Sequence, residues 1–573
     1  MPNLASEAME REPAPGERRS PSPGRAFGWL AVLLVVFTGL RLWQLELDAP
    51  AVVVPGYSGQ AHFRDEPAKA HEARNKAKWD RWSLSDADDY GFWRSQSPTW
   101  VWGEYYWFRA FGVGLVQARS FVVVQTIIAL ALLMWLALIR HGLPAAVATG
   151  LLLGLNWAYL VYSRLALMEG ALICWLLVAT IMLSQLERNP ARAGLWSMSA
   201  TASMLIACMI KQTGLLLVPA FAVALLLLGL RAAGVVGAID DRDAAWRVRL
   251  GARLRRREAQ ASVLAIAVLA VALGLLVFNP DYQDRLEFNA AHFTVAAHDQ
   301  PILKRAARTL VRGLFGARIQ LMFNRLAPLA LWLATVELAR QLIVLGRRWR
   351  ARKRGEPAPR ARGLLEGPVD TIDLWMLAWA ILALLANLAS PHRAIRFQLI
   401  LVPPAAWLAG ALVSRAWLHQ WPSLVWTRGV RAGLVMLALL GTTLTGMRFT
   451  EWMRSEQASA ASIGAELEDL IGEREAVVIG EFAAQAVFET EYQHFYVRPN
   501  QFNFTPEILR ALAITHVITA DPKHDRIVKL LKKEVPDLLD DWRKLGTIEF
   551  RGQTLEVWEL APPPTAPGPD QGT

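Results

Sequence analysis

The sequence has little cysteine and none of the short motifs that mark several common classes of soluble enzyme. Only two cysteines, Cys174 and Cys208, occur among 573 residues, and both lie inside apolar runs. They predict neither a disulfide framework nor a zinc site. The sequence also has no P-loop, no dinucleotide-binding fingerprint, no metalloprotease motif and no evident internal repeat. These absences argue against nucleotide, dinucleotide and zinc chemistry.

Long apolar runs are abundant. The chain is 54% hydrophobic, and about eleven of its runs approach the length needed to cross a bilayer, roughly 17–25 residues. These runs are residues 26–45, 121–139, 143–161, 170–186, 195–210, 213–230, 261–278, 326–345, 372–388, 397–413 and 430–447. They predict an α-helical polytopic membrane protein with a transmembrane domain over residues 26–447.

The distribution of charge predicts the orientation of this domain. The formal net charge is +11, but the arginines cluster between apolar runs, as in residues 247–257 and 347–362. That pattern is typical of cytoplasmic loops and gives no reason to expect a nucleic-acid partner. Residues 1–25 then form a disordered cytoplasmic tail. Counting spans from this tail places the first loop, residues 48–120, on the outer side of the membrane.

The pattern changes after residue 447, which the same count also places outside. Apolar density falls, and short strands and helices alternate. Strands are expected at residues 476–480 and 515–519, a hairpin at 547–550 and 554–560, and helices at 460–471, 506–512 and 525–533. They predict a small extracytoplasmic α/β domain over residues 448–561, followed by a disordered tail over 562–573. The composition suggests a bacterium, so we expect the inner membrane, with this domain in the periplasm.

Charged residues from distant parts of the chain are predicted to share the outer side. Charges at span ends are costly and tend to face a cavity or a partner. The residues are Asp65, Glu66, Arg164, Glu169, Lys211, Arg393 and Arg396. Carboxylates and cations together suit catalysis on an anionic lipid head group. The alternatives are a snorkelling role for Glu169 and head-group anchoring by Lys211 and Arg396.

The acidic pair Asp65-Glu66 is the centre of this set. Pro67 is favoured at the first position of a helix, which predicts a helix starting there and a dipole that favours ionised carboxylates. An ionised carboxylate can take a proton from a hydroxyl; the alternative is a helix cap beside a solvated acid. The cations of this helix either contact a phosphate or form a solvated polar face. They are Lys69, Arg74, Lys76 and Lys78.

Aromatic residues are dense just before the second span. After Ser97-Pro98 come Trp100, Trp102, Tyr105, Tyr106, Trp107, Phe108 and Phe111. This density predicts a helix in the outer interface, which anchors the chain, roofs a groove for a lipid tail, or does both. His292 and His298 are candidates for a divalent metal site or simple surface residues.

The order of these features resembles a known superfamily. They are the acidic pair, Phe111-Gly112-Val113, Ala118-Arg119, and residues 163–169, 211–215 and 396–404. This layout, over residues 26–447, looks like the GT-C superfamily of integral-membrane glycosyltransferases. Within it, the chain resembles family 39 and its relatives, which include protein O-mannosyltransferases and aminoarabinose transferases. Phe397 departs from the Tyr that the family often has there, which removes one hydroxyl.

The resemblance implies an inverting transfer of a sugar from a polyprenyl-phosphate donor to a hydroxyl of a lipid, glycan or protein. It implies that Asp65 is the general base, with Glu66 and Glu169 as the other acidic positions. Lys211 and Arg396, with Arg393 nearby, would hold the donor phosphate. Because cationic side chains can neutralise a leaving monophosphate, no metal cofactor is obligatory, although a divalent ion stays open.

Two other classes of function stay open at this stage. A flippase or transporter for lipid-linked sugars would place ionisable groups near the bilayer midplane and show repeat symmetry. A non-catalytic envelope-assembly protein would use the C-terminal domain as its binding module, and would not need Asp65.

Overall fold

The computed structural model describes the following residues: 23–48, 60–84, 92–233, 257–280, 282–283, 335–337, 339–340, 343, 350, 354, 371–389, 399–419, 424–454, 460–480, 482–495, 505–550 and 553–560. Most of the predicted tails and most of the predicted span at 326–345 lie outside these residues. Arg393, Arg396, His292 and His298 lie outside them as well.

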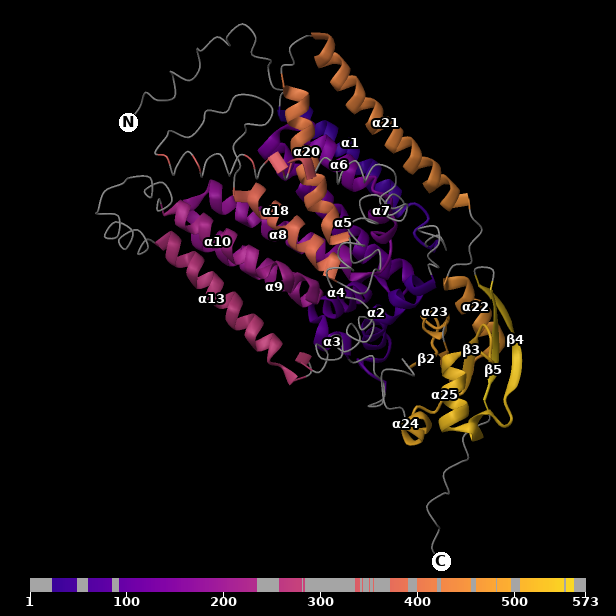
Figure 1. Cartoon of the computed structure of the whole chain (residues 1–573). Helices are drawn as coiled ribbons and strands as arrows, with labels where there is room; N and C mark the ends of the chain where they lie inside the picture. The colour runs from indigo at the N-terminus through magenta and orange to yellow at the C-terminus, as the bar shows by residue number, and fades with distance from the viewer. Residues whose placement is uncertain are drawn as a thin grey trace, which may run out of the picture.

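A bundle of apolar helices forms the larger part of the described chain (Figure 1). Its helices are α1 (Pro23–Leu42), α5 (Leu115–His141), α6 (Leu143–Gly154), α7 (Trp157–Tyr162), α8 (Met168–Arg188), α9 (Ala193–Ile210), α10 (Val218–Ala232), α13 (Arg257–Val277), α18 (Thr371–Ala389), α20 (Val402–Leu418) and α21 (Leu424–Arg454). Short 3₁₀ turns precede α9, α10 and α20: η2 (Pro190–Arg192), η3 (Gln212–Leu217) and η4 (Leu399–Leu401).

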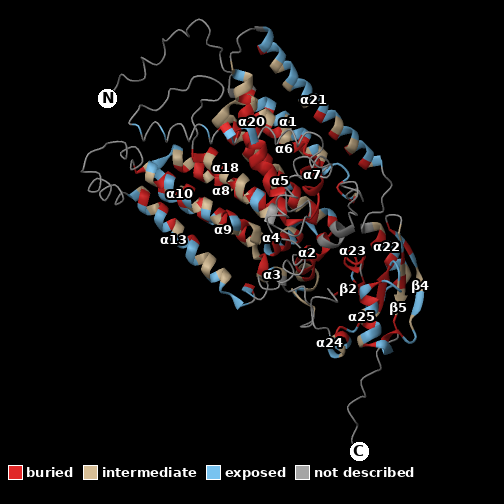
Figure 2. Ribbon diagram, viewed as in Figure 1, coloured by how far each residue is buried: buried red, intermediate tan, exposed pale blue. Residues whose placement is uncertain are grey.

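The bundle has the helices expected of a multi-pass membrane protein. Seven helical stretches among the described residues are long and apolar enough to cross a membrane, and three shorter apolar helices accompany them. They coincide with every predicted run except residues 326–345. Buried residues concentrate in α5, α8 and α20, while α13 and α21 at the margin have few buried residues (Figure 2). Exposed apolar side chains on such marginal helices suit contact with lipid.

The described residues of the first loop form three helices: α2 (Gln60–Trp79), α3 (Phe92–Gln96) and α4 (Pro98–Phe111). The expectation that a helix starts at Pro67 is wrong, because Pro67 lies inside α2. Asp65 and Glu66 are therefore helical residues and do not cap the helix. Glu66 is held by contacts to other helices, and such tertiary contacts override a local start signal. The predicted aromatic helix is α4, which ends at Gly112 with a φ of 87° that favours glycine.

The C-terminal part is a mixed five-stranded sheet with helices on both faces. Its strands are β1 (Val477–Gly480), β2 (Gln493–His494), β3 (His516–Thr519), β4 (Arg543–Phe550) and β5 (Gln553–Glu559), in the order β2-β1-β3-β5-β4. Strand β1 is parallel to β2 and β3, and β5 is antiparallel to β3 and β4. The predicted small α/β fold is thus confirmed.

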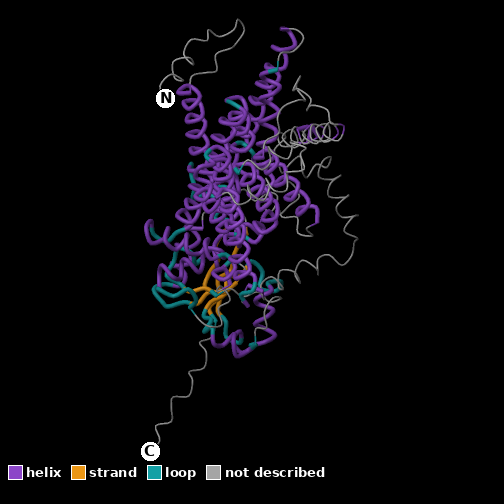
Figure 3. Tube along the Cα trace, turned by 90° about the vertical axis from the view of Figure 1, so that its left-hand side faces the viewer, coloured by secondary structure: helices purple, strands orange, loops and turns teal. Residues whose placement is uncertain are grey.

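Alternating residues of the central strands divide the core of this domain in two. Val478 and Ile518 pack with α22 (Ala460–Ile471) and α23 (Ala483–Ala486), while Ile479 and Val517 face the other side. That other side is covered by α24 (Pro506–Ala511), α25 (Arg526–Glu534) and the turn η5 (Pro536–Leu539). Figure 3 shows the strands at one end of the helical bundle, so the domain caps that end.

Candidate active site at one end of the bundle

Glu66 is enclosed by a network of charges. Arg119 of α5 donates to both of its carboxylate oxygens, at 3.0 and 2.9 Å, and the Ala166 N–H donates to Oε1 at 2.7 Å. Arg119 also donates to Asp48 at 2.6 Å. The remaining Arg119 donor, Nη1, binds the carbonyls of residues 45–47, which follow the C-terminal end of α1. All three charged side chains are at most 3% exposed.

A second ion pair, between Lys211 and Glu169, lies close to this network. Lys211 Nζ donates to Glu169 Oε1. Glu169 is in the first turn of α8, where the helix dipole favours a carboxylate. Lys211 follows the end of α9, and Gly214 follows in η3, where a Cβ would lie only 3.2 Å from the Cys208 backbone. Burial lowers the pKa of Lys211, and Glu169 opposes that effect.

Lys69 of α2 connects the two pairs. It lies one helical turn after Glu66, its side chain is buried, and its ammonium is 5.7 Å from the centre of the Trp93 ring. Its positive charge acts on both Glu169 and Lys211. The solvated-face interpretation is therefore wrong for Lys69, which faces the interior of the site. Arg74 is buried too, against the C-terminal domain.

Glu104 of α4 is a member of the site that the sequence analysis missed. Its side chain is fully buried, and its electrostatic neighbours include Glu66 and Lys69. Burial raises the pKa of Glu104 well above its usual value, and Trp100 and Lys69 oppose that rise. The sequence does contain a signal for this residue, because Glu104 is the one acid in the aromatic segment from Trp100 to Phe111. A carboxylate in an apolar segment is costly to bury and therefore indicates a functional or structural role.

The other predicted site residues are placed as follows. Asp65 lies in α2 directly before Glu66; its side chain, like Arg393 and Arg396, lies outside what the structure describes. Arg164 donates to the carbonyls of Leu40 and Gln44 at 2.9 and 2.7 Å, so it supports the end of α1. The structure thus brings together Glu66, Lys69, Glu104, Glu169 and Lys211 as the site cluster.

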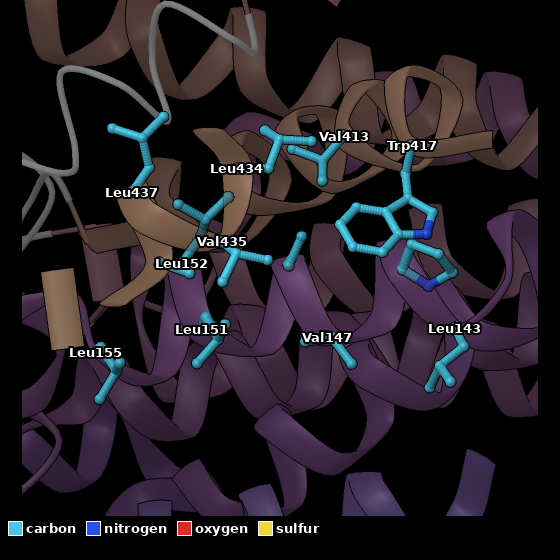
Figure 4. Close-up of a pocket in the computed structure, with 13 residues that line it drawn as sticks. Leu143, Val147, Leu151, Leu152, Leu155, Val413, Trp417, Leu434, Val435 and Leu437 are labelled. Carbon is cyan, nitrogen blue, oxygen red and sulfur yellow. The ribbon is translucent and has the colours of Figure 1, made fainter. Parts of the chain in front are cut away.

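An apolar crevice lies elsewhere in the bundle, between α6, α20 and α21 (Figure 4). It has a volume of about 340 Å³, and side chains such as Leu151, Val413 and Leu434 line it. No ionisable residue lines this crevice, so it offers hydrocarbon contacts and no group for acid–base chemistry. Across the described residues, no three metal-ligating side chains of the His, Cys, Asp and Glu types gather in one place.

The site cluster combines groups that can exchange protons with groups that can bind an anion. Glu169 and Glu104 are carboxylates, and Lys69 and Lys211 are point charges that suit a phosphate. The cluster is assembled from α2, α4, α8 and the turn after α9, and it is mostly buried. A buried environment strengthens the effect of each charge on a bound group.

The fold is shared with a solved membrane protein. ArnT from Cupriavidus metallidurans in the apo state matches with a TM-score of 0.52 at 14% identity, covering 93% of this chain and 98% of that one. The same protein bound to undecaprenyl phosphate matches with a TM-score of 0.51 at 15% identity, with the same shares covered. AglB from Archaeoglobus fulgidus has a TM-score of 0.48 at 12% identity, covering 86% of this chain and 69% of that chain.

The likeness to ArnT confirms the predicted GT-C type of fold. The narrower resemblance to family 39 stays a prediction. No family model and no curated protein sequence matches the chain. The chain is thus an α-helical, multi-pass membrane protein of GT-C architecture with a small α/β domain at its C-terminal end.

Proposed function

We propose that this chain is an inverting glycosyltransferase that moves a sugar from a polyprenyl-phosphate donor to an acceptor hydroxyl. The observation that carries the proposal is the buried site cluster of carboxylates and lysines at one end of the bundle. The structure of ArnT with undecaprenyl phosphate, a protein of the same fold, supports a polyprenyl-phosphate ligand for this chain. The acceptor is a lipid, glycan or protein hydroxyl at the outer, periplasmic face of the inner membrane.

The reaction needs a base on the acceptor and positive charge on the leaving group. In our proposal Asp65 removes the proton of the acceptor hydroxyl, and the new C–O bond forms at the anomeric carbon. The bond to the donor phosphate breaks, and that phosphate leaves with the electron pair as a dianion. Lys69 and Lys211, with Arg393 and Arg396, neutralise the charge that develops there. Four cations suffice for this, so we propose that no divalent metal is required.

The three acids take different roles in this proposal. Glu66 accepts three hydrogen bonds, two of them from Arg119, so we assign it to holding α2 in place next to Asp65. Glu169 accepts a hydrogen bond from Lys211, and donor phosphate would compete with Glu169 for that lysine. Glu169 would then be released to face the sugar.

A matched pair of lysine variants tests the proposal. Lys69 and Lys76 lie on the same helix, but Lys76 pairs with Asp80, whose side chain is 87% exposed. Purified wild type, Asp65→Asn, Lys69→Met and Lys76→Met would be incubated with radiolabelled polyprenyl-phosphate sugars, with and without EDTA, in membranes that contain acceptors. We expect Lys69→Met to lose about a hundredfold in transfer rate, Asp65→Asn to lose at least as much, and Lys76→Met to match wild type.

Several outcomes would overturn the assignment. Equal transfer by wild type and Asp65→Asn would remove Asp65 as the base and favour Glu169. Loss of transfer in EDTA, restored by a divalent ion, would refute the metal-free mechanism. If wild type transfers no label but moves it across a sealed vesicle membrane, the chain is a flippase, and if it does neither, the glycosyltransferase assignment is wrong.

A further inference from the structure

Helix α2 has two buried faces that contact different parts of the molecule. Glu66 and Lys69 face the membrane bundle and belong to the site cluster. His71, Arg74 and Lys78 instead bond to residues 487–494 of the C-terminal domain, which we name the docking loop. The same helix that presents the acidic pair is therefore clamped between the two parts of the chain, as the adjacent labels α2 and α23 in Figure 1 suggest.

Arg74 makes the central contact with the docking loop. Its side chain is fully buried. Nε donates to the Phe488 carbonyl at 2.7 Å, and Nη2 reaches the carbonyls of Val487, Thr490 and Tyr492 at 2.7, 2.8 and 3.0 Å. A planar guanidinium holds several acceptors in a fixed geometry, which a lysine cannot reproduce. The contact therefore fixes both the rotation of α2 about its axis and its position along that axis.

Neighbouring contacts extend the clamp on both sides of Arg74. Lys78 Nζ donates to the Thr490 carbonyl and to the Glu491 carboxylate, each at 2.7 Å, and His71 Nε2 donates to the His494 carbonyl at 2.9 Å. Contacts to three successive turns of one helix resist tilting as well as rotation.

The docking loop also enters the membrane part of the molecule. Phe488 is fully buried in a cluster with Ala73, Phe108 and Ala118, residues of α2, α4 and α5. Glu489 Oε1 accepts from the Leu115 N–H at 2.9 Å, which satisfies a free donor at the start of α5. Helix α5 carries Arg119, the partner of Glu66. The loop thus contacts both helices that form the enclosed charge network.

We propose that the C-terminal domain is a positioning device for the transfer reaction, in which the docking loop holds α2 so that Asp65 and Lys69 are correctly placed, with Arg74 as the positioning residue. This inference rests on the proposed function. Displacing a reacting group by about 1 Å can cost about a hundredfold in rate. Loosening the clamp should therefore reduce kcat, because Asp65 and Lys69 act on the proton and the charge that move in the transition state. The donor KM should change little, because Lys211, on another element, still binds the donor phosphate in the ground state.

Two variants test the proposal from opposite sides of the contact. Arg74→Lys keeps the charge and loses the planar fork. Thr490→Val leaves α2 untouched and removes the hydroxyl that donates to the Val487 carbonyl at 3.0 Å and accepts from the Tyr492 N–H at 3.1 Å. Thr519→Val is the matched control, because Thr519 is equally buried in the same domain and its hydroxyl accepts from the Asp521 N–H within the sheet region.

The measurements are kcat and donor KM for each full-length variant, with hydrogen exchange along α2 as a readout independent of activity. We expect Arg74→Lys and Thr490→Val to lose at least about tenfold in kcat, with donor KM within about threefold of wild type. Exchange in α2 should increase in both. Thr519→Val should keep the wild-type kcat and the wild-type exchange of α2, whatever its melting temperature.

The failure of this inference is distinct from the failure of the proposed function. If Lys69→Met abolishes transfer while Arg74→Lys and Thr490→Val keep full kcat, the enzyme assignment stands and the positioning role is refuted. An equal loss of kcat in Thr519→Val also refutes it, because general weakening of the domain would then explain the effect. If Arg74→Lys does not fold, Thr490→Val decides the question alone. A wild type that transfers nothing overturns both proposals.

Discussion

The two ion pairs at the end of the bundle next to the C-terminal domain differ in how far their side chains are exposed. Arg119 is 1% exposed and directs all its donors to Glu66, Asp48 and the carbonyls of residues 45–47. Lys211 is 17% exposed in its pair with Glu169. The two pairs lie near each other, because Glu66 also accepts from the backbone of Ala166, three residues before Glu169.

This difference in exposure distinguishes an ion pair that holds the fold together from one that can bind a ligand. A buried charge with every hydrogen bond made has no capacity left for a ligand, whereas a partly exposed lysine can exchange one anion for another. Arg119 and Glu66 therefore connect α5 to α2, and Lys211 and Glu169 are the pair that a donor phosphate would open. The sequence alone gives all four residues the same appearance, that of a charge near a span end.

The largest expected effect comes from breaking the enclosed pair. Arg119→Met leaves Glu66 and Asp48 buried without their cation, which we expect to cost about 3–5 kcal/mol of folding stability. Lys211→Met leaves one buried carboxylate, Glu169, which still has the charge of Lys69 nearby. It should therefore cost less than half as much, while it reduces transfer strongly. The measurement is the thermal unfolding of each purified variant in detergent, alongside the transfer assay.

The order of the two stability losses decides whether the two ion pairs have different roles. If Lys211→Met destabilises the protein as much as Arg119→Met, both pairs are structural and our distinction between them is wrong. Glu66→Gln provides a control, because it keeps the shape of the side chain and much of its hydrogen bonding. It should fall between wild type and Arg119→Met in stability.

A second prediction concerns two buried histidines at the contact between α2 and the docking loop. Burial lowers the pKa of His494 to about 4 and that of His71 well below its usual value, and in both cases the charge of Arg74 adds to the effect. When the docking loop opens, each histidine regains an ordinary pKa of about 6.5 and binds a proton more readily. The docked state is therefore fully stabilised above about pH 6.5 and loses stability as the pH falls towards 4.

Hydrogen exchange in residues 487–494 measures this pH dependence. Between pH 7.5 and 5.5, after correction for the intrinsic exchange rate, we expect protection to fall by about tenfold for each histidine that the opening exposes. His71→Gln removes one titrating group and should reduce the pH dependence. Protection that stays constant or increases on acidification would show that neither histidine is released when the loop opens.

Much of the fold was predictable because its signals are local. The predicted helix at residues 460–471 matches α22, and the predicted hairpin matches β4 and β5 within a few residues. Strand β2 was missed because two residues carry no periodic pattern, and α23 because one alanine-rich turn does not either. Membrane spans were found because length and apolar composition define them directly.

The site was less predictable because its contacts join distant residues. The charge and spacing of Lys69 and Arg74 suit a solvated helix face, but Lys69 is buried beside Trp93 of α3 and Arg74 is buried against the docking loop. Glu104 was overlooked among aromatic residues that predict an interfacial helix. Glu169 and Lys211 were chosen because they lie at predicted span ends, and the resemblance to known enzymes gave them roles. The structure adds that they bond to each other.

The smallest expected effect sharpens the comparison by adding an exposed ion pair. Arg474 donates to Glu559 at 2.7 Å, but its side chain is 65% exposed, and Glu559 has a second partner in Arg543 at 2.5 Å. Removing one of two cations in water leaves no buried charge unpaired, so Arg474→Gln should change stability by less than about 0.5 kcal/mol. The thermal unfolding assay used for Arg119→Met measures this directly. A loss of stability as large as that of Lys211→Met would mean that exposure does not determine how much each ion pair contributes to stability. The contribution of the enclosed pair could then not be attributed to its burial and complete hydrogen bonding.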